Sequence, residues 1–125
     1  MPFGPGLHAS AKLVVTDADT AIALHSGSVP VLGTPRLIAL CEEASVLAVA
    51  EELPTGHTTV GMRVQVDHLA PTSVGSEVAA EATLEKVEGR RLTFTVSVSD
   101  HCGLVAAGKV TRVLVETERF LDKAR

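Results

Sequence analysis

The sequence predicts an α+β fold in which one long helix packs against a curved antiparallel sheet. One stretch, residues 37–52, is rich in helix-forming residues, and four later segments alternate apolar with polar residues as strands do. The chain is 46% hydrophobic yet has three Phe, no Trp and no Tyr, so its core must be built from Val, Leu and Ala. With 125 residues, we expect a single domain over residues 1–125.

The segment before the helix contains one predicted strand and an irregular connection. Residues 7–16 alternate well enough for a first strand, with Ala9, Ala11, Leu13 and Val15 on one side. Residues 17–26 are ambiguous and compatible with a short helical turn, and residues 27–33 form a loop punctuated by Gly and Pro.

The helix has clear start and stop signals. Thr34 can cap its first turn and Pro35 suits the first helical position, where a missing N–H costs nothing. Leu53-Pro54, followed by Gly56, ends it. Its alanines would let a sheet approach closely, and most of its charged residues lie near the ends. We therefore expect a central, buried helix.

Four strands follow, over residues 57–69, 76–87, 91–99 and 104–116. Alternation predicts these inward rows: Val60, Met62, Val64, Val66 and His68; Val78, Ala80, Ala82 and Leu84; Leu92, Phe94, Val96 and Val98. The last segment is apolar on both faces, as an interior strand is. Residues 88–89 and 100–103 carry turn signals, so we predict an antiparallel meander. The segment 118–125 reads as a polar tail that can be helical.

Composition argues against several classes of protein. A net charge of −4 disfavours a nucleic-acid binder, no apolar run reaches the roughly 18 residues of a membrane span, and residues 1–10 lack a signal peptide's features. Cys41 and Cys102 are too few for a disulfide framework, and Cys41 reads as a small buried hydrophobe. The histidines show no metal-ligand spacing, so we expect no metal site. We also expect no cofactor. Because neither a membrane span nor a signal peptide is indicated, we expect a cytoplasmic location.

Glu42 and His68 are the strongest candidates for chemistry. On the helical wheel Glu42 is flanked by apolar residues with no Lys or Arg among them, so a central helix would point this carboxylate at the sheet. His68 ends the inward row of its strand, and an imidazole suits acid–base catalysis near neutral pH. The alternatives are that Glu42 reaches solvent past the sheet edge and that His68 is a core histidine or is turned outward by a β-bulge.

Thr34 lies two helical turns before Glu42. Helix capping alone explains a Thr followed by Pro, but the same hydroxyl at a pocket mouth would position water or a substrate. Both roles are compatible.

Several short motifs together resemble the fluoroacetyl-CoA thioesterase family and its hot-dog-fold relatives. They are Gly-Thr-Pro-Arg-Leu at 33–37, Leu-Cys-Glu-Glu-Ala at 40–44, Val-Asp-His-Leu-Ala-Pro-Thr at 66–72 and Val-Glu-Gly-Arg-Arg-Leu at 87–92. The resemblance runs from about residue 31 to the end, with Thr, Glu and His in the family's order and spacing.

The resemblance implies a hot-dog fold, a homodimer with active sites at the dimer interface and Thr34, Glu42 and His68 as the catalytic set. It also implies that the backbone of Gly61 lies beside the reacting carbonyl, and that the protein hydrolyses an acyl-CoA thioester. One departure is clear. The family's fluoroacetate enzyme guards its pocket with phenylalanines before the helix, whereas residues 24–31 contain none, so the preference for fluoroacetyl-CoA does not carry over.

Arg36, Arg90 and Arg91 are candidates for binding the CoA phosphates, although solvated charge is the ordinary explanation for such groups. Two other functions stay open: a hot-dog hydratase or dehydratase, and an acyl-CoA-binding module without turnover. A hydratase would place its carboxylate and imidazole close together in the chain, whereas Glu42 and His68 lie on different elements. Assembly of dimers into tetramers also stays open.

Overall fold

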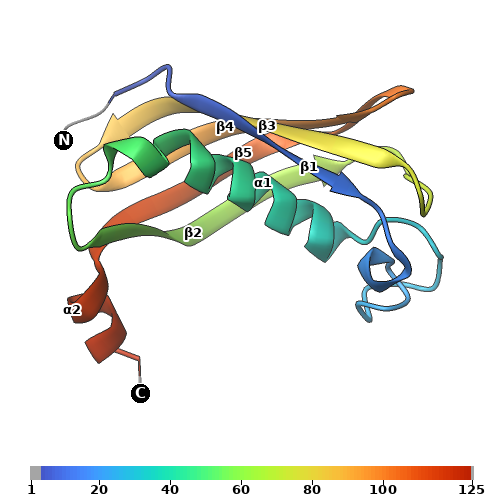
Figure 1. Ribbon diagram of the computed structural model, residues 1–125, viewed down its shortest axis with the longest axis horizontal. Helices are drawn as coiled ribbons and strands as arrows, with labels where there is room; N and C mark the ends of the chain where they lie inside the picture. The colour runs from blue at the N-terminus through green and yellow to red at the C-terminus, as the bar shows by residue number, and fades with distance from the viewer. Residues whose placement is uncertain (1–3, 125) are drawn as a thin grey trace.

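The computed structural model describes residues 4–124 and has the predicted α+β architecture (Figure 1). Helix α1 (Thr34–Val49) lies across the concave face of one five-stranded sheet. The strands are β1 (His8–Val14), β2 (His57–His68), β3 (Glu77–Glu88), β4 (Arg91–Asp100) and β5 (Gly103–Glu116). Single 3₁₀ turns cover Asp17–Asp19 and Ala50–Glu52, and the short α2 (Thr117–Asp122) hangs from the end of β5 (Figure 1).

The sheet order is β1-β3-β4-β5-β2, with every neighbouring pair antiparallel. Strands β3, β4 and β5 form the predicted meander, and β5 is an interior strand, as its apolar faces indicated. The expectation that all four later strands follow one another in the sheet is wrong. Strand β2 forms one edge of the sheet and pairs with β5, and the chain then crosses over to β3, which lies between β1 and β4.

The helix starts one residue earlier than predicted. Gly33 is the N-cap residue and makes no side-chain cap, while Thr34 and Pro35 occupy the first two helical positions. The predicted capping role of Thr34 is therefore wrong, because its hydroxyl bonds elsewhere. The helix reaches Val49, and the 3₁₀ turn carries the chain to the predicted stop.

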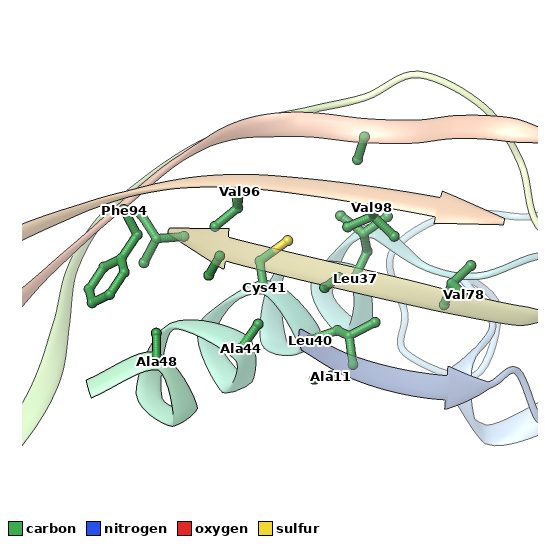
Figure 2. Packing of buried hydrophobic residues seen from close by; sticks show 14 of the residues in the cluster. Ala11, Leu37, Leu40, Cys41, Ala44, Ala48, Val78, Phe94, Val96 and Val98 are labelled. Atoms are coloured by element: carbon green, nitrogen blue, oxygen red, sulfur yellow. The ribbon is translucent and has the colours of Figure 1, made fainter. Parts of the chain in front are cut away.

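One side of α1 builds the core, which Figure 2 shows from close by. Its buried side chains, among them Leu37, Leu40, Cys41 and Ala44, pack on the inward rows of β1, β3 and β4. Every residue predicted for the inward rows of β3 and β4 is buried. Because the only aromatic side chain in this buried cluster is Phe94, the helix approaches the sheet over small and aliphatic groups.

The other side of α1 is uncovered, so the expectation of a fully buried helix is wrong for the single chain. Val46 and Leu47 are 38% and 48% exposed. The helix packs mainly on β1 and β3 and barely touches β2 and β5. The helix therefore leaves much of the concave face at β2 uncovered.

A β-bulge in β2 changes which of its residues face inward. Gly61 pairs with Arg112 and Arg63 pairs with Thr111, so Met62 is an extra residue in the ladder. Before the bulge Thr59 and Gly61 share the inward face, and after it Val64, Val66 and His68 do. The predicted inward positions of Val60 and Met62 are wrong for this reason, and Met62 is 43% exposed.

The ends of the chain add little to the fold. The tail predicted from residue 118 forms α2, and Arg125 and residues 1–3 of the N-terminal segment lie outside the described residues. Within residues 4–124, no helix is both long and apolar enough to cross a membrane.

Candidate active site

Thr34 and His68 are in direct contact. Thr34 is the first residue of α1 and His68 is the last of β2, and the helix start and strand end meet at one end of the sheet. Thr34 Oγ1 lies 2.9 Å from His68 Nδ1, a hydrogen-bond distance. The other ring nitrogen, Nε2, is buried and has no hydrogen-bond partner among residues 4–124. The hydroxyl–imidazole pair is the arrangement by which a histidine activates an oxygen nucleophile.

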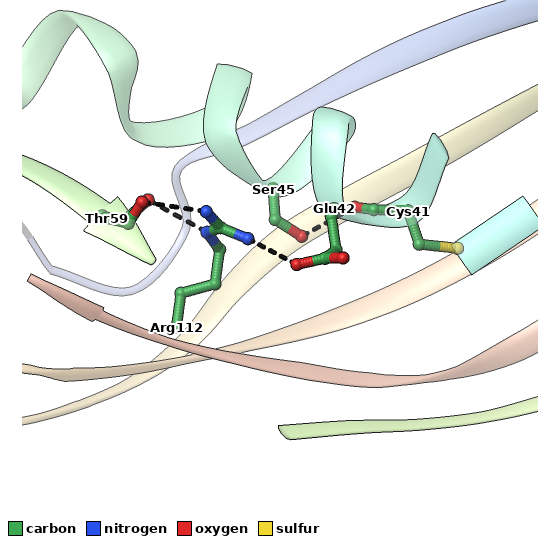
Figure 3. A network of polar contacts seen from close by, with 5 residues as sticks. All are labelled: Cys41, Glu42, Ser45, Thr59 and Arg112. Carbon is green, nitrogen blue, oxygen red and sulfur yellow. Dashed lines mark hydrogen bonds and ion pairs between the residues drawn. The ribbon is translucent and has the colours of Figure 1, made fainter. Parts of the chain in front are cut away.

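Glu42 faces the sheet, as the helical wheel predicted, and meets a buried cation there (Figure 3). Arg112 Nη1 donates a hydrogen bond of 2.8 Å to Glu42 Oε2. Its Nε and Nη2 groups donate to the hydroxyl and carbonyl oxygens of Thr59, each at 2.9 Å. The guanidinium thus bonds to β2 and to α1. Its bonds to Thr59 hold it in a fixed orientation, in which it pairs with the Glu42 carboxylate.

Sequence reasoning missed Arg112, although a signal was present. Arg112 lies between Val110 and Leu114 in the inward row of an interior strand, where all three are buried. A single arginine in such a row needs a carboxylate, and Glu42 was the predicted inward carboxylate without a cation. The pairing of Arg112 with Glu42 can be inferred only when it is known that β5 passes beneath α1.

Gly61 lies against Glu42. A Cβ atom built on Gly61 would be 2.6 Å from Glu42 Oε2, closer than side-chain atoms approach. The absent side chain leaves room for the carboxylate over the strand backbone. The bulge after Gly61 is what puts this glycine and His68 on one face of β2.

Four of the predicted site residues, together with Arg112, therefore form two groups on the same face of the sheet. Thr34 and His68 form one, and Glu42, Gly61 and Arg112 form the other. Within residues 4–124 no hydrogen bond joins Glu42 to Thr34 or His68. Glu42 follows Thr34 by eight residues on α1, about 12 Å along the helix axis.

A cavity of about 330 Å³ opens beside the first group. Thr34 and His68 form part of its wall, and apolar side chains such as Val29, Val31 and Leu69 form much of the rest. The residues that line it come from the loop before α1, the start of α1, the end of β2 and the segment after β2. A reactive pair on the wall of an apolar hollow is a common arrangement in small-molecule sites.

The three arginines proposed for phosphate binding lie apart from this cavity. The Arg36 guanidinium is 3.4 Å from the Asp19 carboxylate. The hydrogen bond from the Thr16 backbone N–H, and to a lesser extent the charge of Arg36, lower the pKa of Asp19. Arg90 and Arg91 lie at the β3–β4 turn and line shallow hollows there.

Two other groups have reactive side chains. Burial raises the pKa of the Cys41 thiol to about 11, which agrees with the prediction of an inert core cysteine. Asp100, His101 and Cys102, at the β4–β5 turn, offer ligand atoms within 4.8 Å of one another, a grouping that histidine spacing did not reveal.

Comparison with known proteins agrees with this architecture. A sequence model of the family described as fluoroacetyl-CoA-specific thioesterase matches residues 15–118. A fluoroacetyl-CoA thioesterase from Streptantibioticus cattleyicolor is 36% identical over 95 residues, which are 76% of this chain and 68% of that protein.

Solved structures share the fold over almost the whole chain. The fluoroacetyl-CoA thioesterase FlK matches with a TM-score of 0.92 and 30% identity, covering 98% of this chain and 96% of that one. A hot-dog-like protein from Thermanaerovibrio acidaminovorans matches with a TM-score of 0.89 and 28% identity, covering 98% and 90%. The predicted hot-dog fold is confirmed, and the family match extends over the helix and strands that hold both groups of site residues. The chain belongs to the fluoroacetyl-CoA-specific thioesterase family.

Proposed function

We propose that this protein is an acyl-CoA thioesterase, which hydrolyses a thioester to a free acid and a thiol. The observation that carries the proposal is the 2.9 Å contact between Thr34 Oγ1 and His68 Nδ1 on the wall of an apolar cavity. Its chemistry fits that of the family to which the chain belongs. Thioester hydrolysis needs an activated oxygen, a proton for the leaving thiolate and stabilisation of the oxyanion.

In the proposed reaction, His68 acts as the acid–base group. It accepts a proton from a water molecule, held by the Thr34 hydroxyl, as that water attacks the thioester carbonyl carbon and supplies the second oxygen of the free acid. The C–S bond then breaks, and His68 returns the proton to the departing thiolate. A neutral imidazole with one nitrogen on the hydroxyl is suited to this exchange at neutral pH.

Glu42 is the second catalytic group of the proposal. Its carboxylate activates the attacking water, or attacks the carbonyl itself to form an anhydride that water then hydrolyses to the free acid and the Glu42 carboxylate. In either case Gly61 would lie beside the reacting carbonyl. The ion pair with Arg112 supports this role because it holds one carboxylate oxygen and leaves the other available. Side-chain exposure of 34% at Glu42 means that a substrate can reach it.

We propose further that the active unit is a homodimer. Strand β2 is an edge of the sheet and displays Met62, and the uncovered side of α1 displays Val46 and Leu47. An edge strand beside an apolar helix face is a surface that a second copy would cover. In such a dimer the site would lie at the subunit interface. Tetramers would use other surfaces.

The substrate would be the only coenzyme in this scheme, since neither protonation step requires a metal or a redox group. Arg36, Arg90 and Arg91 are the groups proposed to bind the CoA phosphates as charged hydrogen-bond donors. We place the protein in the cytoplasm.

A panel of acyl-CoA and acyl-carrier-protein thioesters tests the function. Release of free thiol supports the thioesterase. Hydration of an enoyl-CoA without thiol release would assign the protein to the hydratases, and tight binding without either reaction would make it a binding module.

Four variants at three positions test the catalytic set. Each of His68→Ala and Glu42→Ala is expected to lower kcat by about a hundredfold or more, because each removes a group that moves a proton or attacks. Thr34→Val keeps the shape of the side chain without its hydroxyl and is expected to lower kcat similarly, whereas Thr34→Ser should stay active. Near-normal kcat in the His68 or Glu42 variant would refute the assignment of that residue.

A further inference from the structure

Within residues 4–124, the cavity beside Thr34 and His68 has a mostly apolar wall without acidic or basic residues other than His68. Its apolar residues include Ala21, Val29, Val31 and Leu69, and no Asp, Glu, Lys or Arg lies among the described residues that line it. The polar side chains on the wall are those of Ser26, Thr34 and His68. The hollow thus presents aliphatic groups around one reactive pair.

We propose that this cavity binds the acyl chain of the substrate and selects uncharged aliphatic acyl groups of about four to eight carbons. The inference rests on the proposed thioesterase function and names its substrate class. The position of Thr34 and His68 limits what the cavity can bind. If this pair acts on the thioester carbonyl, the part of the substrate next to it in the cavity is either the acyl chain or the thiol arm of coenzyme A.

Polarity distinguishes these two occupants. The thiol arm of coenzyme A carries two amides and leads to phosphates, and buried amides require hydrogen-bond partners. The cavity wall is predominantly aliphatic and uncharged, so it suits hydrocarbon better. The same wall disfavours acyl groups with a second carboxylate, such as succinyl, because that charge would lose its hydration without gaining a cation.

Size sets the range of chain lengths. An apolar protein cavity of about 150 Å³ holds one benzene ring, and the cavity here has about 330 Å³. It is open on one side, since Val29 and Leu69 are 52% and 62% exposed. An acyl chain of about four to eight carbons would cover the apolar wall. A fluoroacetyl group would leave most of the hollow to water, and residues 24–31 contain no aromatic side chain that would fill it.

A chain-length series tests the proposal directly. The substrates are acetyl-, butyryl-, hexanoyl-, octanoyl-, fluoroacetyl- and succinyl-CoA, and the readout is kcat/KM for thiol release. A fully buried methylene is worth about a fourfold gain, so we expect hexanoyl-CoA to exceed acetyl-CoA by about tenfold or more in this half-open cavity. Equal or falling values from acetyl to octanoyl, or a preference for succinyl- or fluoroacetyl-CoA, would overturn it.

A pair of variants locates the selectivity. Val29→Phe fills part of the cavity and is expected to lower kcat/KM for octanoyl-CoA by about tenfold more than kcat/KM for acetyl-CoA. Val74→Phe is the matched control, since Val74 is also exposed, at 42%, and does not line the cavity. Equal losses for both substrates in Val29→Phe, or the same chain-length shift in Val74→Phe, would contradict the assignment.

Binding of unreactive analogues separates this inference from the proposed function. Ethyl, butyl, hexyl and octyl thioethers of coenzyme A have no carbonyl to hydrolyse, and their Kd values report the cavity alone. We expect Kd to fall from ethyl to hexyl, and Val29→Phe to abolish the gain. This pattern without thiol release from any acyl-CoA would reject the thioesterase and keep the cavity assignment; thiol release without this pattern would reject the cavity assignment alone.

Discussion

The guanidinium of Arg112 is a buried positive charge that three hydrogen bonds keep in one place. Two of its nitrogens bond to Thr59 on the neighbouring strand, and the third bonds to Glu42 on the helix. Arg112 is 7% exposed, so its charge has little water to replace a lost partner. This contact therefore does two things: it orients the carboxylate and ties α1 to β5.

Replacing Arg112 with Met is expected to destabilise the protein by about 2–3 kcal/mol. The change leaves Glu42 without its cation and the Thr59 carbonyl without its donor, and the partial exposure of Glu42 keeps the cost below that of a fully buried pair. Urea unfolding measures it. The double variant Arg112→Met with Glu42→Gln should lose less than the two single changes added together. Strict additivity would show that the ion pair contributes nothing.

Gly61 permits the carboxylate of Glu42 to lie against the strand. Because a Cβ there would be 2.6 Å from Glu42 Oε2, Gly61→Ala must displace that carboxylate. We expect kcat to fall by about ten- to a hundredfold, since small displacements of reacting groups have effects of this size. Circular dichroism and urea unfolding should show a native-like protein, and Gly4→Ala is a control with open space around it. Unchanged kcat would mean that the position of Glu42 does not matter.

At the scale of elements, α1 depends on small side chains. Ala44 is fully buried against the sheet, whereas Ala39, on the same helix, is exposed. A larger side chain at position 44 would have to push helix and sheet apart, because the core is close-packed.

Ala44→Leu is therefore expected to destabilise the protein by about 1–3 kcal/mol in urea unfolding. Ala39→Leu makes the same chemical change on the exposed side and should alter the free energy of unfolding by less than about 0.5 kcal/mol. Equal effects of the two changes would contradict the packing described for α1.

Strand β2 shows where pattern reasoning was sufficient and where it failed. Its limits, and the inward position of His68, followed from alternation and are confirmed within one residue. The bulge at Met62 was not predictable, because no residue type marks it and it depends on how β5 pairs alongside. Without the bulge Gly61 and His68 would face opposite sides of the sheet, since they are seven residues apart.

At the scale of the whole molecule, the two edges of the sheet differ. Strand β1 forms one edge and lies beside α1, whereas β2 forms the other and leaves part of the concave face uncovered. Met62 on this second edge strand, and Val46 and Leu47 on α1, expose apolar side chains. The proposed dimer would therefore form through β2.

Met62→Lys tests that interface. It would bring two positive charges near the symmetry axis of the dimer, and we expect the dimer Kd to rise by about a hundredfold or more. Sedimentation velocity over a range of concentrations measures the change, and acyl-CoA hydrolysis should fall with dimer content. Val14→Lys places the same charge on an exposed residue of the β1 edge and serves as control. Dissociation by Val14→Lys alone would assign the interface to the opposite edge.

The sequence by itself determined the elements and the inward rows of β3 and β4, because alternation and helix signals are local properties of the chain. It also singled out Thr34, Glu42 and His68 as candidates. Only the tertiary structure decided that Thr34 bonds to His68 instead of capping the helix, and that Glu42 meets Arg112. These contacts join residues 34 and 70 positions apart, and they depend on sheet order and on one bulge, which local patterns do not encode.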